Sequence, residues 1–239
     1  MGTKNTLLIL LFFLIALVTN AQSVIGAWEG QYTDGSDQEI RTVVIFADSY
    51  QVRTDYQARS GKFIHTNGGT WKLDGDTMTE MVEFHSDDPT VVGKEFNFTV
   101  TLQDSLLYIA GGEMKLKRID AGMPGKLYGA WLMSGRVRDG ITQLRDTDRP
   151  RKTMKILSGT RFQWIAYNTE TGDFMGTGGG TYTTTDGKYT ENIEFFSRDD
   201  SRVGASLEFD YELKDGNWHH SGLSSKGTPI SEIWSIRNE

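Results

Sequence analysis

The chain of 239 residues contains the same stretch twice, and this repeat constrains the fold more than any other feature. Residues 63–111 align without gaps on residues 174–222, and 17 of the 49 positions are identical. Gly68-Gly69-Thr70, for example, returns as Gly179-Gly180-Thr181. An ungapped match of this length is far beyond chance, so we expect two tandem copies of one structural unit.

The copies also begin and end alike. Ile25-Gly26-Ala27-Trp28 near the start of the first copy corresponds to Tyr128-Gly129-Ala130-Trp131 in the second, and the copies end near Arg118 and Arg237. Because the linker between them is very short, we expect the two units to pack on each other. The expected division is a signal peptide at 1–21, a first unit at 22–120 and a second unit at 126–239.

The first 21 residues have the features of a secretory signal. Lys4 provides the positive start, Leu7 to Val18 is an unbroken apolar run, and Thr19-Asn20-Ala21 places small residues at the cleavage site. A helix of 12 residues is too short to span about 30 Å of hydrocarbon, although a retained N-terminal anchor is the alternative. The chain has no Cys, which excludes a lipid anchor, disulfides and thiolate metal sites. We expect a periplasmic or secreted protein.

The charge balance limits the possible partners. The formal net charge of −7 becomes −8 when Lys4 leaves with the signal. Such a surface repels nucleic acid and anionic lipid on average, so we expect neither as a partner and no membrane insertion after cleavage. A small-molecule or oligosaccharide ligand, even an anionic one, remains compatible because a local Arg or His cluster can override the mean field.

Within each copy the hydrophobic pattern is that of β-strands. Short segments rich in β-branched and aromatic residues alternate with Gly, Asp and Asn turns, and no helical periodicity follows the signal segment. The first copy has room for seven to nine strands, enough to close a barrel without exposed edges. We expect an all-β protein of two antiparallel barrels.

Both copies resemble the lipocalin pattern. In that pattern an early Gly-x-Trp, here Gly26-x-Trp28, meets an arginine of the last strand, here Arg118, across the closed end of the barrel. Gly129-x-Trp131 with Arg237 repeats it. The Gly-Gly-Thr…Thr-Glu-x-x-Glu-Phe stretch further resembles small lipocalin-like domains of exported bacterial proteins. The resemblance implies two lipocalin-like β-barrels, with units shorter than classical lipocalins and without their disulfide.

A glutamate in each copy is a candidate general acid. Strand alternation places Glu80 on the same face as Val82 and Phe84, with His85 on the opposite face, and Glu191 has the matching position in copy two. If this face looks inward, burial raises the pKa of the carboxyl group and prepares it to donate a proton. The alternative is a structural glutamate that is hydrogen-bonded to the backbone or to an arginine.

The four histidines are private to one copy each, which makes them candidates for function. His65 and His85 belong to copy one, and His219 and His220 to copy two. Adjacent strand residues point to opposite faces, so His219 and His220 cannot share one site. We take His65, His85 and His219 as candidate catalytic residues, with exposed or turn positions as the alternative. No His-x-His or His-Glu-x-x-His spacing occurs, and no metal site is expected.

Aromatic residues beside arginines suggest a binding surface. Flat aromatic faces stack on sugar rings, and an Arg forks onto a carboxylate or sulfate. The alternative is that most of these aromatic residues belong to the core. The candidate substrate-binding residues are Arg53, Arg161, Trp164, Tyr56 and Trp71, and Tyr167 is a further candidate catalytic residue.

These groups together suit an elimination reaction. An Arg would neutralise a uronate carboxylate, a His or Tyr would remove the proton α to it, and a second acid would protonate the departing oxygen. Such chemistry needs neither metal nor cofactor. The doublet also resembles the small oligosaccharide dehydratases of marine polysaccharide utilisation, such as those that serve ulvan breakdown. We therefore expect an exported dehydratase or lyase that acts on a terminal uronic acid.

Two other classes of function remain open. One is a non-catalytic lipocalin-like protein that binds a small apolar or saccharide ligand. The other is a structural or inhibitory partner that makes contact through Arg149-Pro150-Arg151. This tripeptide lies between Ser134 and Lys155, where copy two has about eight extra residues that we expect to lengthen a loop. Because the copies differ at their polar residues, one barrel or the cleft between the barrels is expected to hold the site.

Overall fold

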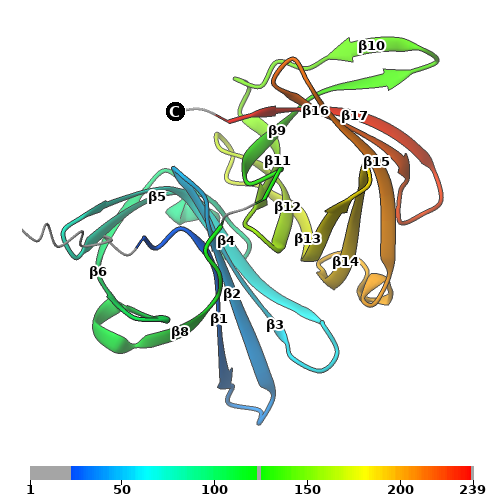
Figure 1. Cartoon of the computed structure of the whole chain (residues 1–239). Coiled ribbons are helices and arrows are strands. Elements are labelled where there is room, and N and C mark those ends of the chain that lie inside the picture. Colours follow the sequence, from blue (N-terminus) through cyan, green and yellow to red (C-terminus); the bar gives the residue numbers. More distant parts are fainter. Residues whose placement is uncertain (1–22, 123–124, 238–239) are drawn as a thin grey trace, which may run out of the picture.

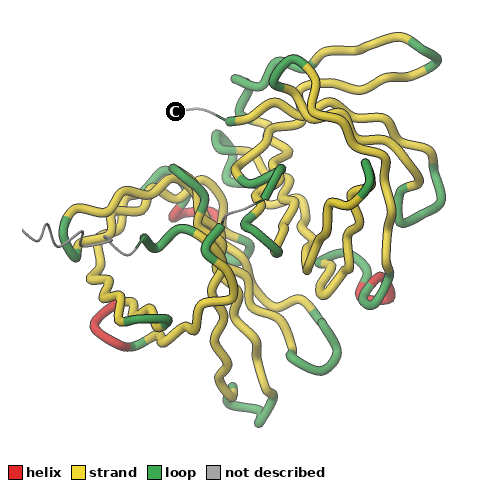
Figure 2. The backbone as a smooth tube through the Cα atoms, viewed as in Figure 1, coloured by secondary structure: helices red, strands yellow, loops and turns green. Residues whose placement is uncertain are grey.

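A computed structural model gives the structure of residues 23–122 and 125–237 (Figure 1). The predicted signal peptide lies outside these residues. The protein is all-β, and its strands close into two antiparallel eight-stranded barrels, which confirms the expected fold class. Helical structure in the described residues is confined to three short 3-10 turns (Figure 2).

The first barrel is a meander in which each strand pairs with the next and β1 closes on β8. Its elements are β1 (Gly26–Thr33), β2 (Glu39–Phe46), β3 (Tyr50–Gln57), β4 (Phe63–Asp74), β5 (Thr77–His85), η1 (Pro89–Val91), β6 (Glu95–Gln103), β7 (Leu106–Ile109), η2 (Ala110–Gly112) and β8 (Met114–Asp120). Trp28, Phe46, Met78 and neighbouring aliphatic side chains fill its interior.

The second barrel repeats this meander and adds one strand. Its elements are β9 (Gly129–Arg138), β10 (Ile141–Leu144), β11 (Arg151–Leu157), β12 (Arg161–Asn168), β13 (Phe174–Thr185), β14 (Lys188–Phe196), η3 (Asp200–Arg202), β15 (Ser206–Lys214), β16 (Asn217–Leu223) and β17 (Pro229–Ile236). β9 closes on β17, and β10 pairs only with the end of β9. The extra residues of copy two thus form an added hairpin strand and not merely the longer loop expected.

A β-bulge at the shared Gly-Gly pair changes which side chains enter the first barrel. The register between β4 and β5 shifts between Gly68 and Gly69, so Glu83 is an extra residue on β5. A Cβ on Gly69 would lie 1.9 Å from the Met81 carbonyl oxygen, which explains why glycine stands there. Glu83 and Phe84 therefore both contact the other barrel, while His85 lies opposite Asn67 on the Glu80 side. The expected strict alternation, with Phe84 beside Glu80 and His85 opposite, is wrong after the bulge.

The closed end of each barrel only partly follows the lipocalin pattern. The Arg118 guanidinium lies 4.0 Å from the Trp28 ring centroid and donates to the backbone oxygens of Ile25 and Ser23, as the pattern predicts. In the second barrel the register pairs Trp131 with Ile236, so Arg237 lies one residue further and points to the other face. Arg237 contacts the first barrel instead.

The two barrels share a hydrophobic core. One cluster of buried residues includes Val52, Tyr56 and Phe84 of the first barrel together with Ile165 and Tyr167 of the second. Thr54 of the first barrel also donates a hydrogen bond of 2.7 Å to Gln163 of the second. The outward faces of β3 and β12 therefore pack on each other in this shared core. Figure 1 shows the two barrels side by side.

Candidate functional site

The interior of the first barrel contains a cavity of about 150 Å³. Its walls are apolar except on one side, where Gln51, Arg53, Asn67 and Glu80 meet. Trp71, a predicted binding residue, forms part of the wall. Its indole N–H donates to the backbone oxygens of Ala47 and Tyr50, so the ring is held in place.

Glu80 is the buried acid of this cavity. Its residue is 8% exposed, and Oε1 accepts hydrogen bonds from the side-chain amides of Gln51 and Asn67. Burial raises the pKa of the carboxyl group to about 7, although the two hydrogen bonds lower it in part. At neutral pH the group is therefore divided between acid and base, which suits proton donation.

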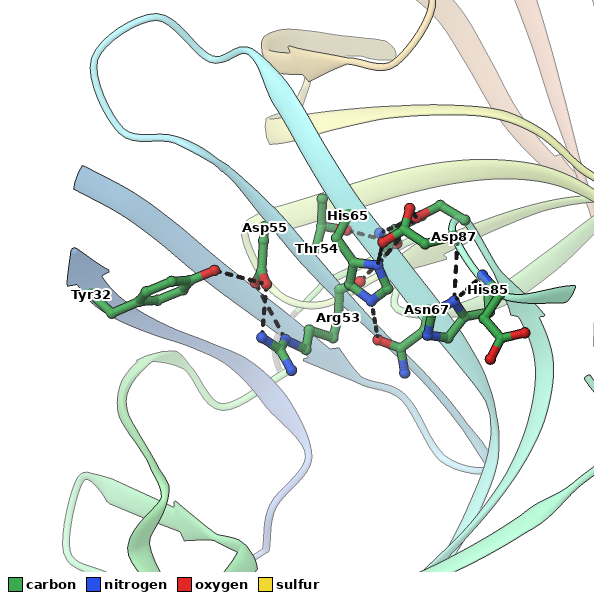
Figure 3. Close-up of polar contacts among 11 residues, drawn as sticks. Tyr32, Arg53, Thr54, Asp55, His65, Asn67, His85 and Asp87 are labelled. Atoms are coloured by element: carbon green, nitrogen blue, oxygen red, sulfur yellow. Dashed lines mark hydrogen bonds and ion pairs between the residues drawn. The ribbon is translucent and has the colours of Figure 1, made fainter. Parts of the chain in front are cut away.

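A hydrogen-bonded chain joins Glu80 to a histidine at the edge of the cavity. Asp87 Oδ2 lies 2.7 Å from His65 Nδ1, and His65 Nε2 lies 3.1 Å from Asn67 Oδ1 (Figure 3). As oriented, the Asn67 amide donates to a carboxylate oxygen of Glu80 and accepts from His65 when Nε2 carries a proton. The reversed amide would accept from a protonated Glu80 and donate to His65 when Nε2 carries no proton. One proton and one amide rotation separate these two fully hydrogen-bonded states.

His85 is fixed as a neutral donor beside His65. Its Nδ1 accepts backbone N–H groups from Asp88 at 2.9 Å and Asp87 at 3.3 Å, so the ring proton is on Nε2. The two imidazole centroids are 4.6 Å apart. Burial and the neighbouring His65 lower the pKa of His85, which keeps the ring uncharged.

Arg53 provides the positive charge of the cavity. Its guanidinium contacts Asp55 through Nη2 at 2.7 Å and Nε at 3.3 Å, and Tyr32 and Thr42 donate to the same carboxylate. Within the described residues, Nη1 has no hydrogen-bond partner. Arg53 is thus oriented by one carboxylate and still has N–H groups for a ligand.

Three other predicted residues lie between the barrels and not in this cavity. Tyr56 donates to Glu194 at 2.7 Å, and Arg161 contacts the same carboxylate at 2.5 Å. Tyr167 donates to Glu83 at 2.7 Å, and Arg237 pairs with Glu83 as well. Burial and these carboxylates raise the pKa of both tyrosines, so neither is suited to be a general base.

Glu191, the equivalent of Glu80, is part of an ion pair inside the second barrel. Lys155 Nζ lies 2.6 Å from Glu191 Oε1, and both side chains are almost completely buried. The rings of Tyr189, Trp218 and Trp234 surround the ammonium at 5.0–5.2 Å. Glu191 therefore matches the structural alternative, a glutamate satisfied by a cation.

Of the two adjacent histidines, His220 and not His219 enters the second barrel. His220 is 2% exposed and its Nδ1 lies 3.7 Å from Glu232, whereas His219 lines an open hollow outside. His220 shares a strand face with Trp218, which is fully buried. That alternation was available in the sequence and identifies the inward member of the pair.

The repeat shows how differently the two interiors are built. Arg53 and Asn67 line the cavity of the first barrel, and His65 and His85 lie next to them. The aligned residues of the second barrel are Trp164, Gly178, Gly176 and Phe196. Five predicted site residues lie together at the first barrel: Arg53, His65, Trp71, Glu80 and His85. The sequence reasoning missed three residues that contact them, Gln51, Asn67 and Asp87. Trp164 lies at the mouth of the second barrel, 5.4 Å from Phe196 between centroids.

Within the described part of the chain, no three His, Asp or Glu side chains gather closely enough to hold a metal ion. None of the helices in residues 23–122 and 125–237 is long and apolar enough to cross a membrane.

Comparison with known protein families gives a match to the second half of the chain. A family model described as "Domain of unknown function (DUF4488)" matches residues 126–237, which contain all strands of the second barrel. No curated protein matches the chain. The family description names no activity.

Proposed function

We propose that the first barrel is the active site of an exported lyase that removes water or a sugar from a uronic acid at the end of an anionic oligosaccharide. One observation carries the proposal. Arg53 and Glu80, whose carboxyl pKa is raised to about 7, line one small cavity, and Asn67 in the same wall joins Glu80 to the Asp87–His65 pair.

Each group has a role in such an elimination. Arg53 and the Nε2–H of His85 bind the uronate carboxylate and stabilise the negative charge that develops on it. His65, oriented by Asp87, accepts the proton from the carbon α to the carboxylate. The C–H electron pair forms the new C=C bond while the C–O bond at the β carbon breaks. Glu80 protonates the departing oxygen, so no oxidant or reductant is needed.

Asn67 lies between the proposed base and acid. Its amide would turn away when the sugar ring enters and release His65 Nε2 and Glu80 Oε1 to the ligand. The cavity of about 150 Å³ is smaller than the roughly 300–1,000 Å³ of pockets that enclose drug-sized ligands. Only the terminal residue of an oligosaccharide would therefore enter, which favours action at chain ends.

The test is an absorbance assay with uronate-ended oligosaccharides, because the product is a conjugated unsaturated uronate. We expect ultraviolet absorbance to grow with the wild-type protein. Glu80→Gln and His65→Ala should each lower the rate about a hundredfold or more. His219→Ala is the matched control, since this histidine lies outside the cavity, and it should leave the rate unchanged. Absence of any signal, or full activity in both variants, would exclude the proposed chemistry.

The second candidate is a non-catalytic binding protein. It is favoured by the hydrogen-bonded chain from Asp87 to Glu80, which is already satisfied without a ligand. This candidate predicts that monosaccharide uronates raise the melting temperature without turnover.

A further inference from the structure

The second barrel has a groove that belongs to copy two alone. The hairpin of β9 and β10 extends one wall of the barrel, and Figure 1 places β10 on the side away from the first barrel. Beneath it lies an open groove of about 620 Å³. The added residues of copy two thus build a surface that the first barrel lacks.

Five arginines line this groove. Arg136 and Arg138 lie on β9, Arg145 follows β10, Arg151 begins β11, and Arg198 follows β14. Only one carboxylate, Glu232, lines the groove with them. This concentration of positive charge stands out on a chain whose formal net charge is −7.

These arginines have no carboxylate partner in the described part of the chain. Arg151 donates to Lys152 O and Thr153 Oγ1, and Arg198 donates to Met175 O, all neutral acceptors. Arg136, Arg138 and Arg145 make no side-chain hydrogen bond or ion pair there. Burial and the charges of Arg136 and Arg151 lower the pKa of Arg145, and the single carboxylate of Glu232 opposes this only in part.

The groove continues into the second barrel. Thr153, Trp164 and Glu232 line both the groove and an inner cavity of about 220 Å³. Two side chains of the inner cavity, His220 and Trp234, are each 2% exposed. Within the described residues His220 Nε2 and Trp234 Nε1 have no hydrogen-bond partner, while His220 Nδ1 lies 3.7 Å from Glu232. Buried polar groups of this kind normally have partners, so their positions suit the hydroxyl groups of a ligand.

We propose that this groove binds an anionic oligosaccharide. Its sulfate or carboxylate groups contact the arginines, one ring stacks on Trp164, and its end reaches the polar atoms of the inner cavity. Arginine forks recognise both anions, and an aromatic face suits a sugar ring. A nucleic acid has the same charge, but the acidic remainder of the surface repels a longer polyanion.

This inference rests on the proposed function, because it concerns the substrate class of the proposed lyase. Binding of the oligosaccharide in the groove and elimination at the first barrel are measured separately, so either can fail without the other. Binding is measured by calorimetry on the Glu80→Gln background, where turnover does not consume the probe. The probes are an oligouronate hexamer, a sulfated galactan hexamer, a neutral hexaose and hexathymidylate. The first two distinguish carboxylate from sulfate recognition.

We expect binding of at least one anionic hexamer, weakening as salt is raised. Arg136→Ala/Arg145→Ala should reduce the affinity about tenfold or more, because two charge-assisted contacts are lost. Arg149→Ala is the matched control. That residue is 75% exposed, pairs with Asp146 and does not line the groove, so its loss should change affinity less than about twofold.

Arg136 is exposed and Arg145 is half-buried in the groove wall, and equal melting temperatures would show that the fold is intact. Three results would overturn the proposal. They are no binding of either anionic hexamer, equal affinity in the double variant, or tighter binding of hexathymidylate than of both saccharides.

Discussion

Glu80 and Glu191 occupy equivalent positions in the repeat, yet their carboxyl groups differ in their partners. Glu191 faces the ammonium of Lys155, whereas Glu80 faces only neutral amides at hydrogen-bond distance. The residue aligned with Lys155 in the first barrel is Val44, which lines the cavity. Loss or gain of that single cation therefore decides whether the glutamate at this position of the repeat is paired with a cation or only with neutral amides.

The raised pKa of Glu80 predicts a pH dependence of stability. The folded-state pKa is about 7 and the ordinary value is 4.5, so folding favours the protonated form. The stabilisation is complete below about pH 4.5 and is lost as the pH rises through 7. Compared with Glu80→Gln, the wild-type free energy of unfolding should fall by about 3 kcal/mol between pH 4.5 and pH 8.

Urea unfolding of both proteins across this pH range measures the difference. A difference that stays constant with pH would show that folding does not raise the pKa of Glu80.

At the scale of single elements, the bulge on β5 decides the composition of the site. Without the extra residue, His85 would point away from Glu80, and the two imidazoles could not lie together at the cavity edge. The second barrel has the same bulge between Gly179 and Gly180, with Phe196 in the place of His85. The bulge is thus scaffold, and the side chain after it is free to change.

Gly69→Ala should be strongly destabilising. The new Cβ would lie 1.9 Å from the Met81 carbonyl oxygen, and backbone on both strands would have to move. We expect a loss of about 3 kcal/mol or more in chemical unfolding. Gly35→Ala is the control, because a Cβ there meets no atom within 4 Å. Equal stability of the two variants would mean that the bulge is not needed.

At the scale of the whole molecule, the barrels meet through the same residues on each side. Tyr167 stands 111 residues after Tyr56, and Glu194 stands 111 residues after Glu83. Tyr56 contacts Glu194, and Tyr167 contacts Glu83. A two-fold rotation that places each barrel on the other therefore also places each Tyr–Glu pair on the other. Phe63 stacks on its own equivalent, Phe174, with centroids 6.0 Å apart. The interface is therefore isologous, as in a two-fold dimer.

This shared core predicts that the barrels unfold together. Glu83→Ala removes the carboxylate that pairs with Arg237 and accepts from Tyr167. Glu194→Ala removes the carboxylate that pairs with Arg161 and accepts from Tyr56. Each should cost about 2–3 kcal/mol, since a partly buried cation is left unpaired. By calorimetry the wild type should show one transition and the double variant two. Two transitions in the wild type would show that the barrels are energetically independent.

Much of the fold follows from sequence, but the site follows only in part. The repeat and strand spacing predict two closed barrels, and alternation places Glu80 inside. His85 could not be placed, because a bulge reverses alternation without changing the hydrophobic pattern. The sequence predicts Tyr56 and Arg161 as substrate-binding residues and Tyr167 as a catalytic residue, because an outward face that packs on a second barrel has the same composition as one that contacts a ligand.

The arginine groove escaped sequence reasoning for a different reason. Its members are scattered between Arg136 and Arg198, and only closure of the barrel brings them together. The net charge of −7 also gives no sign of these arginines, because it sums them with the many acidic residues of the rest of the chain.

The isologous contact has one further consequence. In a homodimer of identical barrels, every substitution occurs in both subunits. A substitution that favours ligand binding at the open end of one barrel therefore also changes the open end of the other. Within one chain each mouth can vary by itself while the common contact surface stays as it is. The first half has a cavity with two histidines beside it, and the second half has a groove lined by arginines. Two identical subunits could not differ from each other in this way.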